Sequence, residues 1–238
     1  MGGIGARSVR GRTARTATAV ASWIAKYVAA VVTFLGLTPA VPAAAQAAAP
    51  LAPPPIYRQP GVARSTPGGQ QQIYAIGDSL IHAIQYILPR YFPGWGVGTW
   101  GANGRSLAEG MDILARTDIP DDGSIILAMG LGTNDPPTHT AQLIAAVRES
   151  LRRVGPDGCV VWATIYRPPQ DGIGYASENG ALRALARDDP RIRVVDWSRS
   201  LHRHPLPMDH SGVHPVTLEG WQRRAQMFSD AARSCGER

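Results

Sequence analysis

The segment QQIYAIGDSL, residues 71–80, places a short apolar run directly before the polar residues Asp78 and Ser79. The run Ile73–Ile76 has no charged residue, which is typical of a strand buried on both faces. Apolar residues at helical spacing follow over residues 80–88. A buried strand that turns at once into a helix predicts a parallel α/β sheet.

The same alternation recurs along the next 150 residues. Apolar runs stand at GVGTWGANG (96–104), SIILAMGLG (124–132), CVVWATIY (159–166) and RIRVVDW (191–197). Helical spacing of apolar residues occupies 107–115, 140–154, 178–187 and 217–232. We therefore predict an α/β fold, a three-layer α/β/α sandwich with a parallel sheet of about five strands.

Polar motifs follow the first three predicted strands, and a fourth precedes the last helix. They are Gly77-Asp78-Ser79-Leu80, Asn103-Gly104-Arg105-Ser106, Gly132-Thr133-Asn134-Asp135 and the segment 209–215, DHSGVHP. In an open parallel sheet, the loops at the carboxyl ends of the strands form the ligand crevice. The four motifs are therefore expected to meet there.

Together these motifs supply the parts of a serine hydrolase site. Ser79 is the candidate nucleophile, and His214 is the candidate base that takes its proton. The backbone N–H groups of Ser79 and Gly104, with the side-chain amide of Asn134, are candidate oxyanion donors. Each motif alone is common, and it is their joint order on separate loops that carries the prediction.

The chain resembles the SGNH, or GDSL-type, hydrolase family through these four motifs, over residues 72–228. The resemblance implies a flavodoxin-like sheet of order 2-1-3-4-5, with Ser79 as nucleophile and His214 as base. It implies an oxyanion hole made by Ser79, Gly104 and Asn134. It also implies ester substrates, such as acetylated sugars, lipids or acyl-thioesters, and no cofactor or metal.

One residue departs from the family pattern. The family places an Asp three residues before the catalytic His, but position 211 here is Ser. Asp209 lies five residues before His214, and a wider loop would let it reach the imidazole. The alternatives are Asp196, after the fifth predicted strand, or no carboxylate, with Ser211 or a backbone carbonyl orienting the ring.

Other polar and aromatic residues have two interpretations. His202, His204, His210 and His214 lie close in sequence, but no carboxylate or cysteine spacing accompanies them, so we expect no metal site. Trp100 either packs in the core or lines a substrate pocket. The segment Tyr166–Pro169 is either a plain loop or contacts the part of the substrate away from the scissile bond. Asp78 and Asp135 are expected to make structural hydrogen bonds.

The chain has two cysteines, Cys159 and Cys235. Cys159 opens the fourth predicted strand at the amino end of the sheet. The last helix starts near the carboxyl end and runs back, which brings Cys235 to the amino end too. We therefore predict a Cys159–Cys235 disulfide, which suits an oxidising compartment.

The net charge of +6 is concentrated at the N-terminus. Residues 1–45 hold five basic residues and no acidic one, then an apolar run (27–37) and the small residues Ala43 and Ala45. This order predicts a signal peptide over 1–45, with an uncleaved anchor as the alternative. Residues 46–69 are rich in Pro and Gly and predict a linker. The domain 70–238 that remains is nearly neutral, so we expect no nucleic-acid partner and no stable membrane insertion after cleavage.

The sequence therefore predicts a secreted or envelope-associated serine esterase that acts on an acetylated glycan or a short-chain acyl ester. An O-acyltransferase of the cell envelope would use the same residues and is the first alternative. A glycan-binding module whose site has decayed at position 211 is the second. Neither the acyl group nor the oligomeric state follows from the motifs.

Overall fold

The computed structural model describes residues 57–58, 71–119 and 124–236. The predicted signal peptide, 1–45, lies outside these residues. So does the predicted linker, 46–69, apart from Tyr57 and Arg58.

One sheet forms the centre of the domain. Its parallel strands are β2 (Gln72–Gly77), β3 (Gly96–Gly101), β4 (Ile125–Gly130), β5 (Cys159–Ala163) and β6 (Ile192–Val195). The order across the sheet is β3-β2-β4-β5-β6, which confirms the predicted α/β fold and the order 2-1-3-4-5. Residues within the strands alternate between two cores, because successive side chains point to opposite faces.

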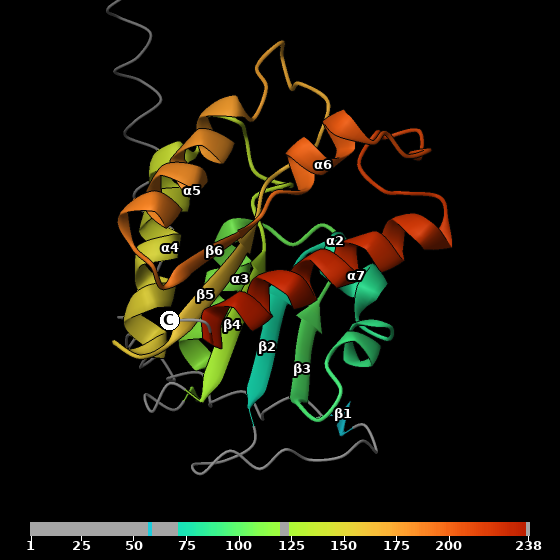
Figure 1. Cartoon of the computed structure of the whole chain (residues 1–238). Helices are drawn as coiled ribbons and strands as arrows, with labels where there is room; N and C mark the ends of the chain where they lie inside the picture. The colour runs from blue at the N-terminus through green and yellow to red at the C-terminus, as the bar shows by residue number, and fades with distance from the viewer. Residues whose placement is uncertain (1–56, 59–70, 120–123, 237–238) are drawn as a thin grey trace, which may run out of the picture. The chain divides into compact units, whose positions relative to one another are not determined.

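Helices cover both faces of the sheet (Figure 1). One core packs α2 (Ser79–Ile84), α6 (Trp197–Arg203) and α7 (Leu218–Arg233) against the sheet. The other core packs α3 (Leu107–Arg116), α4 (Thr140–Val154) and α5 (Ala176–Asp188) against the opposite face. The predicted three-layer sandwich is therefore correct.

Three elements differ from the sequence prediction. The helix predicted over 80–88 ends at Ile84, and a 3₁₀ turn, η1 (Leu88–Tyr91), follows. Pro89 cannot continue an α-helix through this segment, because it lacks the N–H that would donate to the carbonyl oxygen of Gln85; it stands instead in the first turn of η1. Helix α6 was not predicted. Strand β1 (Tyr57–Arg58), inside the predicted linker, pairs antiparallel with the edge strand β3.

The predicted disulfide is present. Cys159 opens β5, and Cys235 lies in the short 3₁₀ helix η2 (Ser234–Gly236) that follows α7. Both cysteines are buried. Within the described residues, no helix is long and apolar enough to span a membrane.

Candidate active site

Ser79 stands at the junction of β2 and α2, at the carboxyl edge of the sheet. Asp78 caps α2, since its Oδ1 accepts a hydrogen bond from the N–H of Leu80 at 2.9 Å. The N–H of Asp78 donates to the carbonyl oxygen of Gly130 at 3.0 Å, which ties the turn to β4. The structural role expected for Asp78 is thus present, and it fixes the position of Ser79.

His214 comes from the loop between α6 and α7. Its Nε2 lies 2.8 Å from Oγ of Ser79, although 135 residues separate the two. A bridge between Met208 and Pro215 closes this loop at its base. The predicted nucleophile and base are therefore within hydrogen-bond distance of one another.

The loop geometry brings Asp209, and not Asp196, to the imidazole. Oδ2 of Asp209 lies 2.9 Å from Nδ1 of His214. A turn makes this possible: the N–H of Gly212 donates to the carbonyl oxygen of Asp209 at 2.9 Å, with Gly212 at a φ of +68° that favours glycine. Asp196 instead forms an ion pair with Arg183 at 2.7 Å.

Ser211, three residues before His214, supports Asp209. Its hydroxyl donates to Oδ1 of Asp209 at 2.6 Å, and its Oγ lies 3.5 Å from Nδ1 of His214. The hydrogen bond from Ser211 lowers the pKa of Asp209 well below its usual value, and bonds from His214 and Val213 add to this effect. Asp209 is therefore held as an acceptor for the imidazole N–H.

The candidate oxyanion donors lie on the neighbouring strand ends. Gly104 follows β3, and no atom stands within 4 Å of the place where a Cβ would begin, so the backbone there is open to a substrate. Asn134 follows β4, and its Nδ2 donates to the carbonyl oxygen of Arg105 at 3.0 Å. One amide hydrogen of Asn134 is thus used to bind the loop of Gly104, and the second is available to a ligand.

Two arginines hold these donors. Sequence reasoning assigned no role to Arg105, and to Arg167 only a substrate contact, as one interpretation of the segment Tyr166–Pro169. Arg105 donates to the carbonyl oxygens of Gly77, at 2.8 Å, and of Trp100. Arg167, on the loop after β5, donates to the carbonyl oxygen of Thr133 at 2.6 Å and to Oδ1 of Asn134 at 3.4 Å. The second bond fixes which way the Asn134 amide points. Arg105 lies in the polar motif 103–106, but its partner Gly77 is at the end of another strand, β2, and the sequence does not show this pairing.

A third arginine is buried close enough to Asp78 for the two charges to interact. Arg224 of α7 is 1% exposed, and its guanidinium lies over the rings of Trp197 and Phe228 at 5.1 and 5.4 Å. Burial lowers the pKa of Arg224 to about 10, and the charge of Asp78 opposes that shift. A sequence signal existed, because Arg224 falls within the otherwise apolar stripe of the last helix.

Asp135 and Trp100, the other residues considered from the sequence, make contacts that stabilise the fold. Asp135 accepts a hydrogen bond from the N–H of Leu107 at 2.8 Å, as expected. Trp100 packs edge-on against Tyr74, with ring centroids 5.3 Å apart. In the part of the chain that the structure describes, no three His, Cys, Asp or Glu side chains form a group suited to a metal ion.

No protein-family model and no curated protein matches this sequence. Solved structures do share its fold. A member of the lipolytic G-D-S-L family from Veillonella parvula is 19% identical, with a TM-score of 0.55, covering 66% of this chain and 95% of that one. The catalytic domain of peptidoglycan O-acetyltransferase A from Streptococcus pneumoniae is 17% identical, with a TM-score of 0.53, covering 71% and 94%.

An α/β hydrolase from the metagenome of Lake Arreo, Spain, is also similar. It is 17% identical, with a TM-score of 0.53, and the match covers 69% of this chain and 96% of the other. At these identities the likeness concerns the fold.

Proposed function

We propose that this protein is a serine esterase of the SGNH type that forms an acyl-enzyme on Ser79. The observation that carries the proposal is the continuous line of hydrogen-bonding atoms from Ser79 Oγ through His214 to Asp209, with separations of 2.8 and 2.9 Å. Such a line has the geometry required to activate a hydroxyl.

Each residue has one task in the proposed reaction. Nε2 of His214 takes the Ser79 proton as Oγ attacks the ester carbonyl, and the N–H groups of Ser79 and Gly104 with Nδ2 of Asn134 bind the oxyanion. The imidazolium then gives its proton to the leaving alcohol. In the second half, His214 takes a proton from water as the water oxygen attacks the acyl carbonyl. The imidazolium then returns that proton to Oγ of Ser79 as the bond to the acyl group breaks, which releases the acid and restores the free enzyme. Asp209 keeps Nδ1 protonated and stabilises the imidazolium.

Hydrolysis of 4-nitrophenyl acetate by the purified protein tests this proposal. Ser79→Ala is expected to remove turnover, while Ser177→Ala, an exposed serine on α5, serves as the matched control. A fluorophosphonate probe should add to the wild type at Ser79, as located by peptide mass spectrometry. Equal turnover by wild type and Ser79→Ala would refute the esterase, and absence of labelling would favour a non-catalytic binding module.

Acyl transfer to a sugar hydroxyl is the second candidate function. It is favoured by the similar fold of the peptidoglycan O-acetyltransferase domain and uses the same acyl-enzyme. The two functions differ in what accepts the acyl group. Incubation with 4-nitrophenyl acetate and a peptidoglycan fragment, followed by mass spectrometry, distinguishes an acetylated glycan from free acetate alone.

We also propose that the protein works outside the cytoplasm, with residues 1–45 removed as a signal peptide and 46–69 acting as a spacer. The buried disulfide supports this location, because such bonds persist in oxidising compartments. Mass spectrometry of the secreted protein should find Gln46 as its first residue. A first residue at or near Met1 would point to an uncleaved anchor.

A further inference from the structure

A cavity of about 550 Å³ lies beside the candidate active site, between the loop after β5, helices α5 and α6, and the loop that carries His214. Its size is typical of pockets that hold small ligands. Ser79 and His214 do not line it, but two of its residues belong to their surroundings. Gly212 forms the turn below Asp209, and Arg167 bonds to Asn134.

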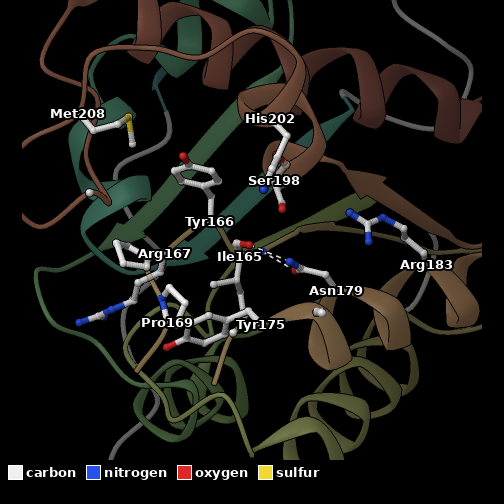
Figure 2. Close-up of a pocket in the computed structure, with 14 residues that line it drawn as sticks. Ile165, Tyr166, Arg167, Pro169, Tyr175, Asn179, Arg183, Ser198, His202 and Met208 are labelled. Carbon is white, nitrogen blue, oxygen red and sulfur yellow. Dashed lines mark hydrogen bonds between the residues drawn. The ribbon is translucent and has the colours of Figure 1, made fainter. Parts of the chain in front are cut away.

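One part of the cavity wall is apolar (Figure 2). It is formed by the rings of Tyr166 and Tyr175, the adjacent Pro168 and Pro169, and Met208. Tyr166 is held by an edge-on contact with His202, with ring centroids 5.4 Å apart. Flat apolar side chains of this kind can pack against the C–H face of a ring-shaped ligand.

The other part offers hydrogen-bonding atoms. Nδ1 of His202 donates to the carbonyl oxygen of Ser198 at 2.7 Å, which leaves Nε2 as an acceptor. Among the described residues, the Ser198 hydroxyl, the Tyr166 hydroxyl and His202 Nε2 form no hydrogen bond with the protein. A purely apolar acyl chain would cover these three atoms without pairing them, which is unfavourable.

The charged residues of the cavity are already engaged by the protein. Arg183 uses Nε and Nη2 to bind Asp196, at 2.9 and 2.7 Å. Arg167 points away from Arg183 (Figure 2) and donates to Thr133 and Asn134. Among the described residues, no Asp or Glu lines the cavity. Because Arg183 is paired with Asp196 and Nη1 of Arg167 is bound to Thr133 and Asn134, the wall offers no pair of free cationic groups that could clamp a phosphate or a carboxylate, and its remaining polar atoms suit a neutral ligand.

From this wall we infer that the cavity binds a neutral sugar unit of the substrate, so that the esterase proposed above acts on an O-acylated glycan. The sugar ring packs on the Tyr166 and proline side, and its hydroxyls pair with Ser198, Tyr166 and His202. The inference rests on the proposed function, because it identifies the alcohol part of the ester that the proposed esterase cleaves.

The test compares two substrates in the full-length protein. One is 4-nitrophenyl acetate, which has no sugar, and the other is the best of a panel of mono-O-acetylated methyl glycosides. The measured quantity is the ratio of kcat/KM for the glycoside to kcat/KM for the nitrophenyl ester. Tyr166→Phe and Ser198→Ala each remove one hydroxyl, and the ratio should fall about three- to tenfold in each. Tyr86→Phe, an exposed tyrosine outside the cavity, should leave the ratio as it is.

Three outcomes would overturn the inference. The first is an unchanged ratio in both cavity variants. The second is that the protein hydrolyses no glycoside in the panel. The third is that Tyr166→Phe raises kcat/KM for 4-nitrophenyl octanoate and leaves kcat/KM for the glycoside unchanged. The last result would make the cavity an acyl-chain pocket. Ser79→Ala separates the two proposals. If Ser79→Ala retains turnover, the proposed esterase itself is refuted. If Ser79→Ala loses turnover but the ratio is unchanged in Tyr166→Phe and Ser198→Ala, only the proposed sugar site is refuted.

Discussion

The acidic partner of His214 comes from two residues before position 211. Ser211 stands three residues before His214, and the carboxylate of Asp209 turns back to the imidazole. The serine hydroxyl then binds the other oxygen of that carboxylate. The sequence left three possibilities open, because the path of a six-residue loop does not follow from any residue period.

Asp209→Asn should lower kcat for 4-nitrophenyl acetate by up to about 10⁴-fold, because an amide facing Nδ1 favours the wrong tautomer of His214. Asp196→Asn should have a far smaller effect, since Asp196 pairs with Arg183. Steady-state kinetics of both variants check this. A loss confined to Asp196→Asn would assign the acid to the other residue.

Ser211→Ala should reduce stability in a pH-dependent way. The pKa of Asp209 is depressed in the folded protein, chiefly by Ser211, so its stabilisation is present above the unfolded pKa of about 4 and declines as the pH falls below that value. We expect a cost of about 1 kcal/mol at pH 7 for this partly exposed bond, and a smaller cost near pH 3. Urea unfolding at both pH values measures it; an equal cost at both would contradict the assignment.

Arg167→Met should lower kcat for 4-nitrophenyl acetate about tenfold, because the Asn134 amide loses the bond that orients it. Asn134→Ala should cost more, on the order of 10²- to 10³-fold, since it removes the donor itself. Arg199→Met, an exposed arginine beside Asp196, is the control. If Arg167→Met and the control behaved alike, Arg167 would have no positioning role.

At the scale of the elements, the strands were predictable and the short helices were not. Strands β2, β4 and β5 are nearly continuous apolar runs, so their positions follow from hydrophobicity. Strand β3 contains three glycines and Thr99, and β6 contains Arg193, so the alternation of strands and helices along the chain is needed to place them. Helix α6 has only seven residues and directly follows β6, which leaves too little length for a helical period to show. Pro89 cannot continue an α-helix, and the apolar spacing over 80–88 does not show this.

The close packing of α2 on β3 yields a prediction at this scale. A Cβ at Gly101 would stand 2.3 Å from the backbone nitrogen of His82, so Gly101→Ala must displace the helix that begins at Ser79. We expect a loss of about 1–3 kcal/mol in stability together with a lower kcat. Thermal unfolding and ester hydrolysis measure the two effects.

Gly180→Ala is the matched control for this variant. Gly180 lies within α5, and nothing stands within 4 Å of its would-be Cβ. Alanine there should be neutral or stabilise the protein by up to about 1 kcal/mol, because glycine is a poor helix former. If both variants behaved alike, close packing at Gly101 would not be the cause.

At the scale of the whole molecule, the disulfide joins β5 to the end of the chain. The two cysteines are 76 residues apart, and closing a loop of that length contributes about 4 kcal/mol at most. The double variant Cys159→Ala/Cys235→Ala should lose stability up to this amount, measured by urea unfolding against the wild type under reducing and oxidising conditions. An unchanged midpoint would show that the bond does not contribute.

The sequence predicts the layers of the fold more completely than it predicts the contacts of the candidate active site. Alternation of strands and helices determines the layers, and the strand-end motifs indicate where the polar residues gather. The supporting arginines could not be assigned, because each has a partner far away in sequence: Gly77 for Arg105, Asn134 for Arg167 and Asp78 for Arg224. Long-range pairing of that kind depends on the folded arrangement.

The two ends of the described domain lie at the amino ends of the parallel strands. β2 starts there at Gln72, and Cys235 is bonded there to Cys159, the first residue of β5. Ser79 lies at the carboxyl ends of the strands, just after β2 ends. A resin, an electrode or a display scaffold attached through either end would thus hold the protein with its crevice facing the surrounding liquid, and no attachment chemistry would be needed on the face that receives substrate.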